Sequence, residues 1–133
     1  MITLQLRGIG LLGPGFADWA QARPLLRAPA GWRREATVVP APARLPANER
    51  RRAGTVVKAA LAVADQAVAM AGADPARLAT VFTSSTGDPA NCHALCEALA
   101  AADPSARLVS PTRFTNSVHN AAAGYWGIAT HSM

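Results

Sequence analysis

The sequence predicts a layered α/β fold in a single domain over residues 1–133. Two segments, residues 2–7 and 78–83, have the apolar patterns of β-strands, and helical periodicity occupies much of the chain between and after them. Strands joined by crossover helices are typical of layered α/β architectures with some parallel pairing. Half of the 133 residues are hydrophobic, which is enough for one domain that buries roughly two thirds of its unfolded surface.

The N-terminal third is predicted to hold a strand, a turn, a short helix and a loop. Apolar and polar side chains alternate over residues 2–7, before a glycine-rich turn at residues 8–15. A short amphipathic helix is expected over residues 16–26. Repeated prolines then predict a surface loop over residues 28–46, because proline lacks the N–H donor and blocks helix.

The middle of the chain contains the strongest helical pattern. Apolar residues recur at helical spacing through residues 47–71, and Gly72 is placed to end that helix. Asp74 followed by Pro75 predicts a capped single turn, and residues 78–83 are predicted to form a strand.

Two further helices are expected in the C-terminal half. Asp88 or Asn91 can cap the first, which is predicted to end near Ala102. A short extended piece at residues 107–109 is predicted to lead to the second helix over residues 115–130, with the Asn116-Ser117 pair able to cap it. The small residues of that helix let another backbone approach closely, which fits a tightly packed core helix or a subunit contact anchored by Tyr125 and Trp126.

The charge balance favours acidic partners. Thirteen Lys and Arg residues oppose eight Asp and Glu residues, a formal net charge of +5. The run Arg50, Arg51 and Arg52 suits an acidic protein surface, although a solvated first helical turn explains it equally. A small nucleic-acid-binding module is an alternative, which the scarcity of aromatic residues near this run disfavours.

The targeting and cysteine patterns predict a cytoplasmic protein that does not enter a membrane. No apolar run approaches the roughly 18 residues of a membrane span, and the N-terminus lacks the pattern of a secretory leader. The two cysteines, Cys92 and Cys96, are too few for a disulfide framework. They share a helical face with no credible third ligand nearby, so we expect small buried thiols rather than a metal site.

Two weak motifs each have a simpler explanation. Gly8, Gly10 and Gly13 match G-x-G-x-x-G, but Pro14 interrupts any helix that would begin there to bind a dinucleotide, so a strand-ending turn is favoured. Ser84, Ser85 or Cys92 could pair with His119 as nucleophile and base. Nothing in their spacing requires it, and residues 84–87 lack the G-x-S-x-G elbow.

Four segments together resemble the β-ketoacyl synthase-like N-terminal family, which includes chain-length-factor-like proteins of bacterial aryl polyene and type II polyketide pathways. These segments are residues 45–52 (LPANERRR), 80–85 (TVFTSS), 91–97 (NCHALCE) and 116–126 (NSVHNAAAGYW). They cover nearly the whole chain in the family's order.

This resemblance implies a thiolase-like fold of which the chain supplies the N-terminal part only. In that family the catalytic cysteine follows about one strand after the helix that matches residues 120–124, and two catalytic histidines lie far downstream. No catalytic residue can therefore be carried over to this chain, and no cofactor or metal is expected. Cys92, Cys96 and His119 do not match the family's catalytic positions.

The resemblance also implies partners and a site. Acyl-chain elongation or chain-length control would require an acyl carrier protein, contacted by Arg50, Arg51 and Arg52, and a ketosynthase partner subunit or a second identical subunit. Residues that would line the acyl pocket or the dimer interface are Arg113, Phe114, Ser117, Asn120, Tyr125 and Trp126. Alone, the chain is expected to be catalytically silent, so whether it belongs to an enzyme stays open. A truncated product without function is a further alternative.

Overall fold

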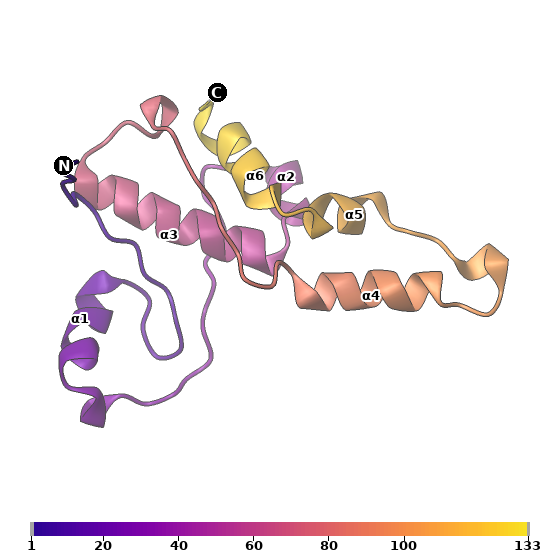
Figure 1. Ribbon diagram of the computed structural model, residues 1–133, viewed down its shortest axis with the longest axis horizontal. Coiled ribbons are helices and arrows are strands. Elements are labelled where there is room, and N and C mark those ends of the chain that lie inside the picture. Colours follow the sequence, from indigo (N-terminus) through magenta and orange to yellow (C-terminus); the bar gives the residue numbers. More distant parts are fainter. Residues whose placement is uncertain (1, 133) are drawn as a thin grey trace.

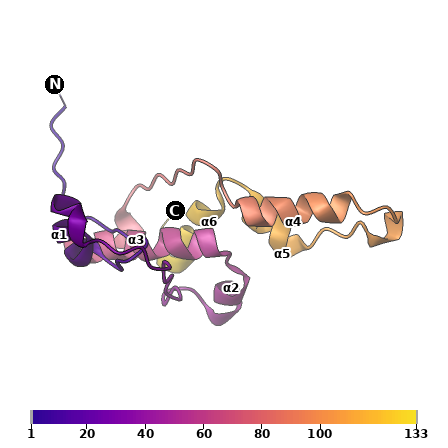
Figure 2. The same cartoon turned by 90° about the horizontal axis from the view of Figure 1, so that it is seen from below.

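The computed structural model describes residues 2–132, in which helices and extended segments surround one long helix, α3 (Figure 1). α6 packs across α3, whereas α4 and α5 form an arm that projects to one side (Figures 1 and 2). The helices are α1 (Trp19–Arg27), α2 (Ala47–Arg52), α3 (Thr55–Ala71), α4 (Pro89–Leu99), α5 (Pro111–Ser117) and α6 (Ala121–Thr130). Three single 3-10 turns are η1 (Pro29–Gly31), η2 (Pro75–Arg77) and η3 (Pro104–Ala106).

The strands expected at residues 2–7 and 78–83 are not formed in the described part of the chain. Within residues 2–132, β-type backbone pairing is found as an isolated antiparallel bridge between Gly13 and Phe16. Neither segment has a neighbouring strand in this part of the chain. Residues 78–83 run extended beside α3, where Val81 is 90% exposed, and residues 2–7 extend away from the body (Figure 2). A strand is defined by the pairing of its backbone with another, so the pattern alone does not produce one. The layered α/β arrangement is therefore not confirmed.

The chain just after the first segment, residues 8–11, is held against α3 by its backbone. The amide of Leu11 donates to Oε1 of Gln66 at 3.0 Å, and the amide of Ile9 lies 3.3 Å from Sδ of Met70. A Cβ atom added at Gly10 would overlap the carbonyl of Val63. Gly8 and Gly10 of the G-x-G-x-x-G match thus serve close helix contact, whereas Gly13 lies against the ring of Phe16. In the described chain no helix begins before Trp19, as a pyrophosphate site would require.

Replacing Gly10 with alanine is expected to destabilise the fold by about 1–3 kcal/mol, because overpacking forces the segment away from α3. Urea unfolding followed by circular dichroism measures this loss. The control is Gly31→Ala, where a Cβ atom meets nothing within 4 Å. Equal stability of both variants would show that the segment does not lie on α3.

Local capping explains where most helices begin and end. Oδ1 of Asp18 accepts from the amide of Gln21, and Oε1 of Gln21 accepts from Ala17, a reciprocal capping box that begins α1. Asp88 caps α4 through the amide of Asn91, and Gly72 in the left-handed region ends α3. The expected ends at Gly72 and at the turn after Asp74 are confirmed.

The single helix expected over residues 47–71 is wrong, because the chain breaks between α2 and α3. Ala53 is extended, and Gly54 begins a new helix. The side chain of Asn116 occupies the break: it accepts from the amide of Gly54 at 2.9 Å and donates to the carbonyl of Arg52 at 2.9 Å. A side chain inserted into the helical hydrogen-bond ladder is a recognised cause of such breaks.

The helix expected over residues 115–130 is also two helices. α5 begins earlier, at Pro111, where Oγ of Ser110 accepts from the amide of Arg113. Val118 is extended and Asn120 makes no side-chain cap, so the Asn116-Ser117 pair does not begin α6. The change of direction lets Asn116 face α2 while α6 packs on α3.

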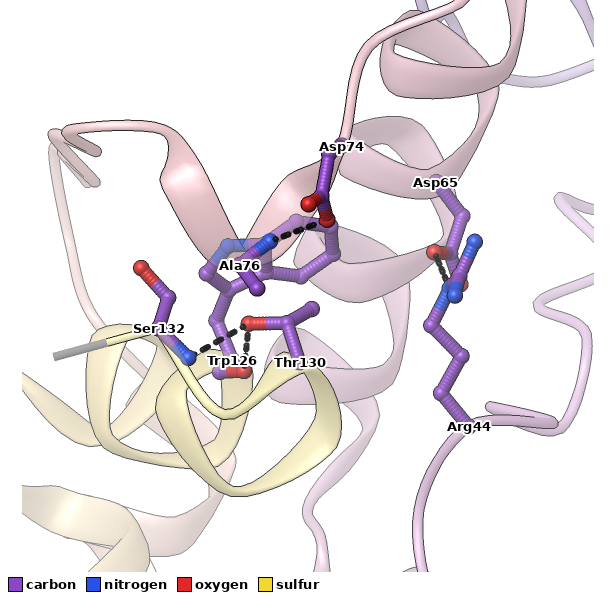
Figure 3. Close-up of polar contacts among 7 residues, drawn as sticks. All are labelled: Arg44, Asp65, Asp74, Ala76, Trp126, Thr130 and Ser132. Carbon is purple, nitrogen blue, oxygen red and sulfur yellow. Dashed lines mark hydrogen bonds and ion pairs between the residues drawn. The ribbon is translucent and has the colours of Figure 1, made fainter.

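The core lies between α3 and α6. Trp126 is 1% exposed, and its ring lies 6.2 Å from the ring of Phe82. Figure 3 shows the carbonyl of Trp126 accepting from Oγ1 of Thr130, which in turn accepts from the amide of Ser132. The other buried members are Leu45, Ala53, Val57, Leu61, Val68, Tyr125 and Ala129.

The loop before α2 is fastened to α3 by an ion pair. Nε of Arg44 lies 2.6 Å from Oδ1 of Asp65 (Figure 3). Leu45, next in the chain, is 1% exposed and inserts into the core. The proline-rich loop therefore ends at a fixed point on α3, which positions α2.

Candidate functional site

A polar junction joins α2, α3 and α5 around Asn116. Besides its bonds to Arg52 and Gly54, Nδ2 of Asn116 donates to the carbonyl of Thr112 at 2.8 Å. Nδ2 of Asn91, on α4, donates to the carbonyl of Arg113 at 2.7 Å and attaches α4 to the same helix. Both asparagines are buried: Asn116 joins the arm to the body, and Asn91 joins the two helices of the arm.

Tyr125 lies at the edge of this junction. Burial raises the pKa of its phenol above the ordinary 10.0, and the carboxylate of Glu49 raises it further. Asn116 and the guanidinium of Arg52 act in the opposite direction without cancelling the rise.

The Tyr125 phenol is expected to titrate above pH 10.0 in the folded chain and near 10.0 in denaturant. The raised pKa means that the folded state disfavours the ionised phenol. The contribution of Tyr125 to the free energy of unfolding is therefore fully present below pH 10.0 and is lost as pH rises through the folded pKa. Tyr125 is the only tyrosine, so tyrosinate absorbance reports it alone. Identical midpoints in native buffer and in denaturant would contradict this environment.

A mainly apolar hollow of about 320 Å³ lies beside the junction. Its walls come from α3, from the second extended segment with the loop after it, and from the start of α6. The apolar lining includes Val56, Val57, Ala60, Val63, Phe82, Val118, Ala121 and Ala122. Ser84, Asp88 and His119 provide polar groups in the same lining. Such a surface suits an alkyl chain whose end is polar.

Ser84 and His119 are brought to one hollow but not to each other. Oγ of Ser84 accepts from the amide of Gly87 at 2.9 Å. Within residues 2–132 it makes no hydrogen bond to His119, and both residues are exposed. A nucleophile needs its base within hydrogen-bond reach, so this arrangement provides no nucleophile-base pair.

The residues that the family resemblance suggested for an acyl pocket or dimer interface do not line the hollow. Arg113 and Phe114 are exposed on α5, and Phe114 is 61% exposed. Oγ of Ser117 donates to the carbonyl of Phe114, and Asn120 is exposed at the start of α6. Their role at an acyl pocket or dimer interface stays a prediction.

The residues of this region that line the hollow are instead Asn116, Val118 and His119. The sequence pattern offers no signal for this choice, because it depends on the break between α5 and α6. Tyr125 and Trp126 are buried within the chain itself, as a packed core helix requires, and their contact with another subunit stays a prediction.

The three consecutive arginines of α2 are not equally free. One Nη atom of Arg50 donates to the carbonyl of Leu45 at 3.0 Å. Arg52 pairs with Glu49 at 3.3 Å, and Arg51 contacts the side-chain oxygen of Asn48. All three guanidiniums therefore make a contact inside the chain.

The cysteines are not buried as expected. Cys92 and Cys96 are exposed free thiols on α4. α4 turns its Asn91 toward α5, so the two thiols lie on faces that α5 does not cover. Nε2 of His93 lies 3.4 Å from Glu97, and no group of three or more potential metal ligands is assembled among residues 2–132.

None of the helices within residues 2–132 is both long enough and apolar enough to cross a bilayer.

Comparison with models of known protein families identifies the family of this chain. The family model of the β-ketoacyl synthase N-terminal domain matches residues 19–133, which include the hollow's helical walls and the polar junction. The chain belongs to the β-ketoacyl synthase N-terminal domain family. Searches of curated proteins and of solved structures gave no match.

Proposed function

We propose that this chain is the N-terminal portion of a protein that elongates acyl chains by decarboxylative condensation, or that sets their length beside a partner that does. We propose fatty acid, aryl polyene or type II polyketide synthesis as its pathway, which membership of the family supports. The observation that carries the proposal is the apolar hollow beside Asn116, whose lining, apart from Leu12, lies within the matched range.

An acyl chain is the ligand that this hollow fits best. Its walls present Val, Ala and Phe side chains, while His119 and Asp88 stand where a thioester or carboxylate end would meet water. Each methylene removed from water stabilises a complex by about 0.8 kcal/mol, so a few buried carbons suffice for measurable binding. Its apolar lining residues outnumber the polar ones, which favours an acyl chain over a sugar or a nucleotide.

Filling the hollow tests this assignment. Ala122→Phe is expected to weaken the binding of a fluorescent long-chain fatty acid by about tenfold, the effect of excluding about two methylenes. Ile128→Phe is the matched control, because Ile128 lies on the same helix, is 46% exposed and is outside the lining. Unchanged affinity in Ala122→Phe, with both variants folded, would exclude an acyl pocket here.

The extended segments support a layered fold in the assembled protein. Residues 2–7 alternate apolar and polar side chains, and residues 78–83 run along the same helix α3. We propose that both become strands once another strand pairs with them, which would cover Ile2, Leu4 and Val81. This arrangement is the thiolase-like α/β architecture expected for the family.

An acyl carrier protein and a second subunit, identical or a ketosynthase, are the proposed partners. The net charge of +5 favours association with an acidic carrier. The exposed Phe114 on the projecting arm is a candidate contact for the second subunit.

Sequencing the coding DNA beyond the codon of Met133 separates the two roles. A cysteine about one strand further on would indicate a condensing enzyme, and an open frame without it would indicate chain-length control. An immediate stop codon would favour the truncated product.

A further inference from the structure

Most of the arginines that make no side-chain contact within residues 2–132 lie on α1 and the loop after it. Arg44 and Arg52 form ion pairs, and Arg50 donates to a carbonyl. In contrast, the exposed guanidiniums of Arg23, Arg27, Arg33 and Arg34 make no hydrogen bond or ion pair with any part of residues 2–132. The same holds for Arg77 and Arg113, which lie singly on η2 and α5. The free positive charge of the chain is thus concentrated away from α2.

Arg23 and Arg27 lie on the same face of α1. Arg23 and Arg27 are four residues apart on α1, so they project from one face about 6 Å apart along the helix. Ala20 and Pro24 join them in lining a shallow depression. Leu26, three residues after Arg23, is 60% exposed beside it.

This face stands on a well-anchored helix. Ala22, on the opposite side of α1, is completely buried, and the capping box at Asp18 fixes the first turn. The loop that carries Arg33 is attached by Nε1 of Trp32, which donates to the carbonyl of Pro14 at 2.8 Å. In Figure 1, α1 lies toward the opposite end of α3 from the α4–α5 arm, so a partner bound there would leave the arm free.

We propose that α1 binds an acidic amphipathic helix of a partner protein. Two carboxylates one turn apart on that helix would match Arg23 and Arg27, and an apolar side chain between them would rest on Ala20 and Pro24. Arg33 and Arg34 add positive charge alongside that steers the partner.

The chemistry of the depression distinguishes this partner from other anions. Phosphate groups would meet both arginines but would leave the apolar floor and Leu26 unused. A membrane surface would need a longer apolar face than nine residues with Pro24 inside them provide. The inference goes beyond the proposed function, because it needs no acyl chemistry and differs in place from a carrier site at Arg50–Arg52.

The test uses a synthetic helical peptide with two Glu residues four apart and a Leu between them, titrated into the isotope-labelled chain. Chemical shifts are expected to change on α1 and at residues 32–34. Arg23→Glu with Arg27→Glu should weaken binding by about tenfold or more, since two attractive pairs become repulsive. Binding should also weaken as salt rises.

Two control variants keep the test decisive. Arg77→Glu with Arg107→Glu makes the same change in net charge elsewhere and should leave the affinity within about twofold. Arg23→Gln with Arg27→Gln removes the charges without placing carboxylates in the last turn of α1, where the helix dipole disfavours them. Its affinity should fall between those of the unchanged chain and the charge-reversed variant.

Several outcomes would overturn the inference. These are equal affinities of the charge-reversed and control variants, shifts centred on α2 in place of α1, or tighter α1-dependent binding of a DNA oligonucleotide or of anionic phospholipid vesicles. A parallel titration with a holo-acyl carrier protein separates the two proposals. Carrier binding that is lost only in Arg50 or Arg51 variants would support the acyl carrier protein as a partner at α2. The peptide titration then tests the α1 site separately.

Discussion

Replacing Trp126 with alanine is expected to destabilise the chain by about 3–5 kcal/mol, the range for removing a large buried aromatic side chain. Trp126 is 1% exposed, contacts the ring of Phe82 and lies at the meeting of α6 with α3. Because a domain of this size is stable by only about 5–15 kcal/mol, the variant should be largely unfolded at moderate urea concentrations. Urea unfolding followed by circular dichroism measures the loss.

Trp126→Phe is the matched control for this prediction. The indole Nε1 of Trp126 is buried and has no hydrogen-bond partner in the described chain, so phenylalanine removes volume without breaking a bond. The cost should therefore be well below that of alanine, about 1–2 kcal/mol. If both substitutions cost the same small amount, α6 is not packed on α3 as described.

Replacing Asn116 with alanine is expected to cost about 3 kcal/mol, because buried polar groups left without partners are expensive. Its side chain satisfies the amide of Gly54 and the carbonyl of Arg52 at the break between α2 and α3. Without it, both groups lose their partner while the break remains. The same denaturation experiment measures the effect.

Asn120→Ala provides the comparison within the same segment. Asn120 is exposed and makes no side-chain cap, so its replacement should change stability by no more than about 0.5 kcal/mol. Equal effects of the two substitutions would mean that Asn116 does not hold the junction. Hydrogen exchange at the amide of Gly54, which should accelerate in the Asn116 variant, gives an independent readout.

Features set by short-range chemistry could be predicted from the sequence. Gly72 ends α3 because glycine adopts the left-handed conformation at little cost, and Asp74 and Asp88 cap the turns that follow them. The family could also be identified, since its motifs are short stretches in a set order, and the family model confirms it over residues 19–133.

The interruptions of the helices could not be predicted in this way. Residues 47–54 read as helical until Asn116, more than sixty positions later, supplies the hydrogen bonds that replace the helical ladder. The exposure of Cys92 and Cys96 has a similar origin, because only the contact between Asn91 and α5 decides which face of α4 is covered.

The candidate site follows the same division. The family resemblance predicted that Arg113, Phe114, Ser117 and Asn120 contribute to a site, but it could not indicate which side chains of this region line the hollow. Val118 and His119 line it because the chain turns between α5 and α6, and Phe114 does not.

What the sequence alone determined is the family, the helix ends at Gly72, Asp74 and Asp88, and the alternation of apolar residues. Each of these is carried by short stretches in which neighbours lie a few positions apart. The tertiary structure alone decided where α2 separates from α3, which arginines remain free, and that residues 2–7 and 78–83 stay unpaired among residues 2–132. The physical reason is that caps are satisfied within one turn, whereas a strand or a helix break needs a partner from a distant part of the chain.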